Sequence, residues 1–161
     1  MAKEIPLNSG MVTIVDDEDF EFLNQWKWTY SKHKRKSTGY ALRGTKKSDE
    51  RKMFYMHREI TKVSDGMYVD HINGNGLDNR KANLRICTSQ QNKWNMKIPK
   101  NNTSGFKGVS WHPQTGKWRA SIHINRKRKS LGLYSTKESA AFAYNAGAQK
   151  YHGEFARLNQ L

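Results

Sequence analysis

Apolar and polar positions alternate most clearly in the last third of the chain. Residues 117–124 carry an apolar side chain at every second position, from Trp118 to Ile124, which is typical of a strand with one buried face. Similar segments at 105–112 and 128–134 flank it, and turn-forming residues separate the three. The pattern therefore predicts three antiparallel strands.

An Ala-rich stretch, residues 136–151, follows these predicted strands. The preceding Ser135-Thr136-Lys137-Glu138 has the spacing of a capping box, which predicts the start of a helix. Small side chains would let such a helix sit close against a sheet. We therefore expect a three-stranded antiparallel sheet with one packed helix over residues 105–161, preceded by a linker rich in Asn and Pro at 99–104.

The first two thirds of the chain predict shorter elements. An apolar hairpin pattern opens the chain, and a run of acidic residues then indicates the first turn of a short helix. The expected elements are a hairpin over 5–15, a helix from Asp16 to about Trp26, and strands at 27–31 and 39–43.

Residues 53–98 predict a strand, a loop, a return strand and a helix. The loop is rich in Asn and Gly, and Thr88 followed by Gln91 fits a second capping box. The expected elements are a short helix at His57–Ile60, strands at Tyr68–His71 and Leu84–Cys87, and a helix from about Ser89 to Lys97. The whole chain is thus expected to be α+β.

The charge of the chain is strongly positive. It has 29 Lys and Arg against 14 Asp and Glu, a net charge of +15. Residues 1–99 account for +6 and residues 100–161 for +9, so the shorter part is far more basic per residue. Such an excess favours a polyanionic partner, and nucleic acid is the first candidate.

Other classes of protein fit the composition less well. No apolar run approaches the roughly 20 residues of a membrane span, and no amphipathic basic helix indicates a membrane surface. The single Cys87 excludes an internal disulfide and a four-cysteine zinc site, and we expect it to be an ordinary packed residue. We expect an intracellular, cytoplasmic protein without a small-molecule cofactor.

Asp70 and His71 are the first candidates for chemistry. Phosphodiester hydrolysis needs a base for water and oxygen ligands for a divalent cation, and Asn83 and Asn92 add amide groups nearby. Neighbouring residues in a strand face opposite ways, so Asp70 and His71 share a site only if the strand ends or bends at 72–74. Spacing alone leaves open a merely structural Asp–His pair.

The segment Tyr68–Arg85, which includes Asp70-His71-Ile72-Asn73-Gly74-Asn75-Gly76 and Asn83-Leu84-Arg85, resembles the core of HNH homing endonucleases from phages and mobile introns. The match extends over Met56–Asn95. The resemblance implies a ββα-metal fold, a Mg²⁺ or Mn²⁺ cofactor and double-stranded DNA as the substrate.

The resemblance also implies roles for single residues. His71 would be the general base, Asp70 and Asn92 would bind the metal, and Asn83 would orient His71 or the loop. Asn95 and Asn79 are alternatives to Asn92. His57 is either a polar scaffold residue or a supporting or phosphate contact, and Arg85 is either scaffold or phosphate clamp.

Residues 105–161 resemble the DNA-binding domain of plant ethylene-response transcription factors of the Apetala-two type, through Gly105–Trp111, Gly116–Ala120 and Leu131–Tyr134. Such domains lay a three-stranded sheet in the major groove. The implied DNA-binding candidates are Lys107, Arg119, His123, Arg126, Lys127, Arg128 and Lys129. Ser110, Ser121 and Ser130 stand where the plant pattern has larger residues, so base preference does not transfer.

The sequence thus predicts four segments: an accessory part at 1–52, a ββα-metal nuclease core at 53–98, the linker at 99–104 and the DNA-binding domain at 105–161. Lys34 and Arg35 lie in a basic loop that is either solvated or in contact with phosphate. We expect a monomeric, site-specific homing endonuclease. The alternative is a DNA-binding regulator with an inactive nuclease centre.

Overall fold

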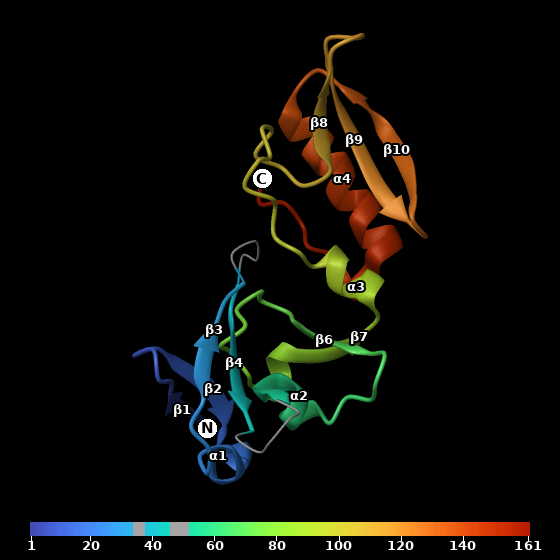
Figure 1. Cartoon of the computed structure of the whole chain (residues 1–161). Coiled ribbons are helices and arrows are strands. Elements are labelled where there is room, and N and C mark those ends of the chain that lie inside the picture. Colours follow the sequence, from blue (N-terminus) through green and yellow to red (C-terminus); the bar gives the residue numbers. More distant parts are fainter. Residues whose placement is uncertain (34–37, 46–51) are drawn as a thin grey trace. The chain divides into compact units, whose positions relative to one another are not determined.

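The computed structural model describes residues 1–33, 38–45 and 52–161 (Figure 1). Over these residues the chain is mixed α/β, with several small sheets and few helices. It divides into two compact units, Met1–Asn92 and Lys93–Leu161. No helix in this part of the chain is both long and apolar enough to cross a membrane. The candidates Lys34 and Arg35 lie outside the described residues.

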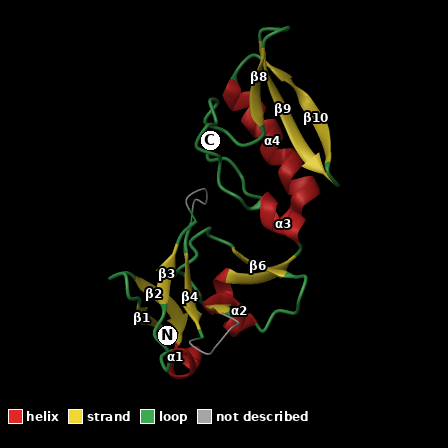
Figure 2. Ribbon diagram, in the orientation of Figure 1, coloured by secondary structure: helices red, strands yellow, loops and turns green. Residues whose placement is uncertain are grey.

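Three small sheets build the first unit (Figure 2). β1 (Ala2–Pro6) and β2 (Val12–Asp16) form the predicted antiparallel hairpin. The second sheet has the order β3-β4-β5, and β6 pairs antiparallel with β7. The other elements are α1 (Asp17–Leu23), β3 (Thr29–Ser31), β4 (Tyr40–Gly44), β5 (Met53–Tyr55), α2 (Met56–Thr61), β6 (Tyr68–His71), the 3₁₀ turn η1 (Lys81–Asn83), β7 (Leu84–Cys87) and α3 (Ser89–Trp94).

Trp28 is buried in the hydrophobic core of the first unit. Its indole Nε1 donates a hydrogen bond of 2.8 Å to the carbonyl oxygen of Leu23, which satisfies the polar end of a large apolar ring. Val15 of the hairpin and Met56 of α2 belong to the same cluster. The core therefore ties the N-terminal hairpin to the helix that precedes β6. Cys87 is also buried, and burial raises the pKa of its thiol to about 11, as suits a packed residue.

The second unit is a three-stranded antiparallel sheet covered by one helix, as the sequence predicted. Its elements are β8 (Val109–His112), β9 (Lys117–Ile124), β10 (Lys127–Tyr134), α4 (Lys137–His152) and the 3₁₀ turn η2 (Gly153–Phe155). Buried alanines of α4 pack on the sheet. The approach is so close that a Cβ on Gly108 would lie 1.9 Å from Cδ2 of Tyr144. Glycine is therefore required there for packing as well as for its φ of +75°.

Several predicted boundaries were wrong. α1 ends at Leu23 rather than near Trp26. α3 ends at Trp94 rather than Lys97, and the ammonium of Lys107 donates to the main-chain oxygens of Trp94, the last residue of the helix, and of Met96 after it. β8 starts at Val109 rather than residue 105, because the preceding segment is a turn held by the Ser104 hydroxyl. The capping residue of α4 is Thr136 rather than Ser135, since its side chain accepts a bond from the amide of Ser139.

Candidate active site

Asp70 and His71 are the last two residues of β6, and both are buried, with about 5 % of each side chain's surface exposed. The chain turns directly after them. The amide of Gly74 donates to the carbonyl oxygen of His71 at 2.8 Å, and Gly74 has a φ of +71°. The strand therefore ends where the sequence indicated a bend.

Arg85 lies opposite Asp70 in the β6–β7 pair. Its Nε and Nη2 donate to Oδ2 of Asp70 at 2.9 and 2.7 Å, and both side chains are largely buried. A buried carboxylate is stable only when it is paired and hydrogen-bonded. Arg85 therefore holds the Asp70 carboxylate in one orientation, and this contact favours the scaffold interpretation of Arg85.

His71 makes a buried contact with Asn79, whose Oδ1 lies 3.0 Å from Nε2 of the imidazole. Burial lowers the pKa of His71, and the bond to Asn79 and the charges of Asp70 and Asp78 partly offset this effect. Asn79 is fully buried. Its amide oxygen is used by His71, so this contact speaks against Asn79 as the alternative metal ligand.

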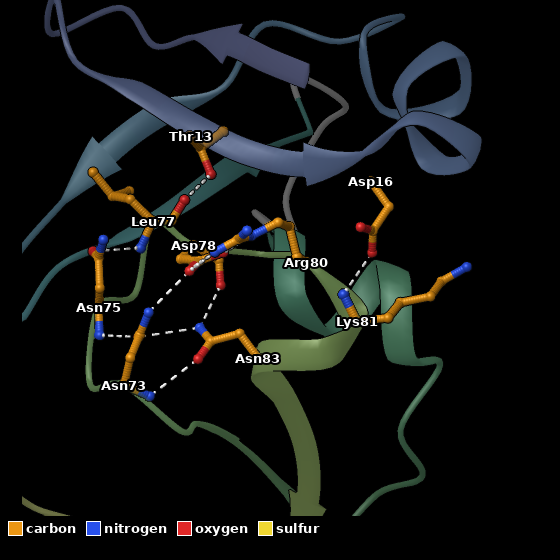
Figure 3. A network of polar contacts seen from close by, with 9 residues as sticks. All are labelled: Thr13, Asp16, Asn73, Asn75, Leu77, Asp78, Arg80, Lys81 and Asn83. Carbon is orange, nitrogen blue, oxygen red and sulfur yellow. Dashed lines mark hydrogen bonds and ion pairs between the residues drawn. The ribbon is translucent and has the colours of Figure 1, made fainter. Parts of the chain in front are cut away.

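Asn83 fixes the loop between β6 and β7 (Figure 3). Its Oδ1 accepts from the amide of Asn73 at 3.0 Å, and its Nδ2 donates to the carbonyl oxygen of Asp78 at 2.8 Å and to Oδ1 of Asn73 at 3.1 Å. These bonds close the loop across its base. Of the two roles expected for Asn83, the geometry favours the one on the loop.

Asp78 is a second anchor of the same loop. Nε and Nη2 of Arg80 each donate to it at 2.7 Å, and Nδ2 of Asn73 donates at 2.9 Å. The Arg80 guanidinium holds the pKa of this carboxyl below its usual range. Beyond Arg80, the amide of Lys81 donates to Oδ2 of Asp16 at 2.7 Å, which joins the loop to the end of β2 (Figure 3).

Rings from two other segments lie beside His71. The ring centroid of His57 lies 5.1 Å from that of His71, and Tyr40 lies 5.7 Å from His71. Burial lowers the pKa of His57 to about 3, with smaller contributions from His71 and Arg58. Nδ1 of His57 finds no hydrogen-bond partner among the described residues. His57 is thus a neutral ring directly beside the proposed base, as a supporting residue would be.

A cavity of about 1000 Å³ opens beside the rings of His57 and Tyr40, and its lining does not include Asp70 or His71. His57, Tyr40, Arg58 and Asn92 contribute to its walls. Asn92 stands in the first turn of α3, and the predicted Thr88–Gln91 capping box starts that helix, with bonds of 2.8 and 3.2 Å. The helix start therefore brings Asn92 to the cavity wall that His57 also lines. The other alternative ligand, Asn95, belongs to the second unit.

Two of the expected ligands carry the donor atoms that a hard divalent cation prefers. Asp70 has a carboxylate, and Asn92 has an amide oxygen. In the described part of the chain, the one group of three acidic, His or Cys residues with converging ligand atoms is Asp16, Glu18 and Asp19. Lys81 pairs with Glu18 and Asp19, so part of the charge of that cluster is compensated internally.

The sequence analysis missed two residues of the candidate active site around His71. Tyr40 contacts the rings of both histidines, and Thr13 of β2 bonds Asn79. Neither belongs to the Asp-His-Asn pattern, and no local motif marks them. Their proximity depends on how distant segments pack, so only the folded chain reveals it.

The sheet of the second unit has an outer face, opposite α4, that carries several predicted DNA-binding residues. His123 pairs with Arg128, Ser121 with Ser130, and Arg119 with Ser110. His123 and the basic run Arg126–Lys129 are exposed. Nε of Arg119 and Oγ of Ser110 are buried without hydrogen-bond partners within the described residues. Polar groups in that state are suited to a ligand.

Two other predicted DNA-binding residues, Lys107 and Lys129, differ from those of the outer face in what their ammonium groups contact. Lys107 donates to main-chain oxygens at the C-terminal end of α3, and Nζ of Lys129 donates to the hydroxyl of Tyr151 on α4 at 2.8 Å. The Lys129 bond lowers the pKa of Tyr151. Both ammonium groups are thus engaged within the second unit. They fit the outer face less well than the sequence indicated, because neighbouring residues of a strand face opposite sides.

Comparisons with known proteins agree with this picture. Residues 59–93 match the family model described as HNH endonuclease. An uncharacterized HNH endonuclease of Acanthamoeba polyphaga mimivirus is 31 % identical over 158 residues, covering 94 % of this chain and 76 % of that protein. Protein 3.8 of Escherichia phage T7 is 39 % identical over 96 residues, covering 60 % of this chain and 78 % of that protein.

Plant transcription factors match a smaller part of this chain. An AP2-like ethylene-responsive transcription factor of Arabidopsis thaliana is 34 % identical over 71 residues, covering 44 % of this chain and 15 % of that protein. No solved structure matches. HNH nucleases generally use divalent metal ions. The chain belongs to the HNH endonuclease family and carries a C-terminal region similar to AP2-type transcription factors.

Proposed function

We propose that the protein hydrolyses phosphodiester bonds in double-stranded DNA with the help of Mg²⁺ or Mn²⁺. The observation that carries this proposal is the arrangement at the end of β6. His71 is held there by Asn79, next to an Asp70 that Arg85 binds, and the loop that Asn83 closes follows directly. Membership of the HNH endonuclease family supports the reaction class.

Each residue has one task in this proposal. The neutral imidazole of His71 accepts a proton from the attacking water. Asp70 and Asn92 hold the cation, and Arg85 and Asn83 keep Asp70 and the loop in place. The cation, when bound, stabilises the charge on the phosphate and the leaving oxygen. The succession β6, β7 and α3 would then serve as the ββα-metal core.

The second unit would select where the DNA is cut. Its outer face combines exposed cations, which contact phosphates whatever the sequence, with Arg119 and Ser110, whose polar atoms lack partners among the described residues. We propose a site-specific enzyme of the homing type that acts as a monomer on DNA inside a bacterial host. The similarity to a phage protein supports this setting.

A DNA-binding regulator with an inactive nuclease centre is the second candidate. The observation that favours it is the burial of Asp70 and His71, because a base that acts on DNA must be reached by water and phosphate. Such a protein would bind DNA in the same way and leave it intact with every divalent cation.

The test uses plasmids that carry random inserts, incubated with the full-length protein and Mg²⁺ or Mn²⁺, with EDTA as the control. Sequencing of cut ends and of bound molecules is done in parallel. The endonuclease gives cut ends that share a sequence and disappear with EDTA. Bound molecules that share a sequence, without any cut ends, would establish the regulator instead.

A further inference from the structure

A chain of buried hydrogen bonds leads from His71 to the N-terminal hairpin. Nε2 of His71 lies 3.0 Å from Oδ1 of Asn79, and Nδ2 of Asn79 donates to Oγ1 of Thr13 at 2.8 Å. The Thr13 hydroxyl donates to the carbonyl oxygen of Leu77, also at 2.8 Å (Figure 3). Thr13 and Asn79 are fully buried, so water does not compete for these bonds.

The direction of this series of hydrogen bonds is fixed at its Leu77 end. A main-chain carbonyl oxygen only accepts, so the Thr13 hydroxyl must donate its hydrogen to Leu77. Thr13 can then only accept from Asn79, which places the NH₂ group of Asn79 toward Thr13. The same NH₂ group lies 3.5 Å from Sδ of Met56, a further weak acceptor. The amide oxygen of Asn79 consequently faces His71.

This direction selects one form of the His71 ring. A neutral imidazole carries a hydrogen on one nitrogen and a lone pair on the other, and hydrogen-bond partners decide which. An amide oxygen requires a donor opposite it, so Nε2 carries the hydrogen. Nδ1 is then the nitrogen that holds the lone pair and accepts a proton.

The hairpin also holds the loop by its main chain. The amide of Ile14 donates to Leu77 at 2.8 Å, and the amide of Asn79 donates to Ile14 at 2.7 Å. Ile14 and Asp78 form a parallel bridge between β2 and the loop. The segment that matches the HNH family model, residues 59–93, does not include Thr13 or Ile14. The N-terminal hairpin thus supplies a part of the site from outside that segment.

We propose that Asn79 and Thr13 are positioning residues that hold His71 with its hydrogen on Nε2 and its lone pair on Nδ1. The consequence for catalysis rests on the proposed nuclease function, whereas the state of the ring does not. This gives residues of the N-terminal hairpin a role in the chemistry of the site.

The test is long-range ¹H–¹⁵N NMR of the full-length, metal-free protein at pH 8 with labelled histidine. The chain has six histidines, and a His71→Ala spectrum identifies the signals of His71. The expected wild-type pattern is a protonated Nε2 and an unprotonated Nδ1. The opposite pattern in the wild-type protein would overturn the proposal without any variant.

Two pairs of variants extend the test. Asn79→Ala pairs with Asn79→Asp, and Thr13→Val pairs with Thr13→Ser. We expect Asn79→Ala and Thr13→Val, which remove the partners, to mix the two ring forms and to lower kcat about 10- to 100-fold at unchanged DNA affinity. Thr13→Ser keeps the hydroxyl and should stay near wild type. Asn79→Asp keeps the acceptor for Nε2 but loses the donor to Thr13 and buries a charge, so it should keep the ring form and lose stability. Thermal melts identify any variant that does not fold.

The outcomes separate the two proposals. Folded Asn79→Ala and Thr13→Val proteins with the wild-type ring form and kcat would overturn the positioning role while leaving the nuclease intact. A ring that responds as expected in a protein that never cuts DNA would support the positioning role and overturn the proposed function.

Discussion

The two units use polar residues in opposite ways. In the first unit, buried polar side chains bond one another, as Asn79 bonds His71 and Arg85 bonds Asp70. In the second unit, the sheet carries its cations on the surface, and His123 and Arg126–Lys129 are exposed. Preorganised buried groups suit a reaction, and exposed cations suit binding to a polyanion. The contrast suggests that the first unit cuts and the second unit binds, and the predictions below test that division.

The largest effect is expected from the buried ion pair. Arg85→Met leaves the Asp70 carboxylate buried without its partner, and removal of one partner from such a pair typically costs about 3 kcal/mol. Urea unfolding of the full-length protein measures this loss. Lys3→Met removes the pair with Asp17, whose two side chains are 44 % and 45 % exposed, and is the control, with a smaller loss expected. Equal losses in the two variants would show that burial does not set the strength of the Asp70–Arg85 pair.

The next largest effect is expected on the metal dependence of cutting, for which Asn92 and Asn95 are the alternative ligands. Asn92→Ala should raise the Mg²⁺ concentration needed for half-maximal cutting about 100-fold, because it removes a proposed metal ligand. Asn95→Ala is the matched variant and should leave the metal dependence unchanged. Titration of cutting with Mg²⁺ decides between them, and the reverse result would move the ligand to Asn95.

A smaller effect is expected from the exposed cations of the second unit. If the protein contacts roughly six phosphates, a plot of the logarithm of the association constant for DNA against the logarithm of the salt concentration should have a slope of about −5. Joint replacement of Arg126 and Arg128 by Ala should weaken binding about 10-fold and reduce the slope to about −3. Cutting at saturating DNA should persist. The control is joint replacement of Lys137 and Lys150 on α4, and an equal effect there would show that charge alone, rather than the sheet face, binds DNA.

The smallest effect is expected from His152, through its contribution to the pH dependence of stability. His152 of α4 stacks on Trp94 at 4.2 Å and bonds the carbonyl oxygen of His123, and burial lowers its pKa. The unfolded chain takes up this proton near pH 6.5, whereas the folded chain resists it. The contribution of His152 to stability should therefore be constant above pH 6.5 and fall as the pH decreases below it, and His57 and His71, whose pKa values are also lowered, add to the fall. Thermal melts between pH 8 and 5 measure the fall, and His152→Gln should reduce it.

Local patterns explain why much of this fold was predictable. The alternation in 117–124 gave β9 with the bounds that the structure shows, and the Thr88–Gln91 box gave the start of α3. The candidates Asp70, His71 and Asn83 form a local pattern around one loop, so the sequence alone singled them out. Hydrophobic periodicity and capping act over a few residues, which is why a single sequence reveals them.

Contacts between distant segments could not be predicted. Thr13 bonds Asn79 across 66 positions in the chain, and Lys107 meets main-chain oxygens 11 and 13 positions before it. These contacts depend on how sheets and helices pack, and neither residue type indicates them. The same reason explains why Lys107 was expected on the DNA-binding face.

The central claim is that His71 is the base for cutting while DNA binding resides elsewhere. The most direct test measures cleavage and DNA affinity of the wild-type protein and His71→Ala side by side, on a DNA that the wild-type protein cuts. We predict that cleavage falls about 1000-fold, while Kd changes less than about twofold because His71 is buried in the first unit. A His71→Ala protein that cuts at the wild-type rate would contradict the account.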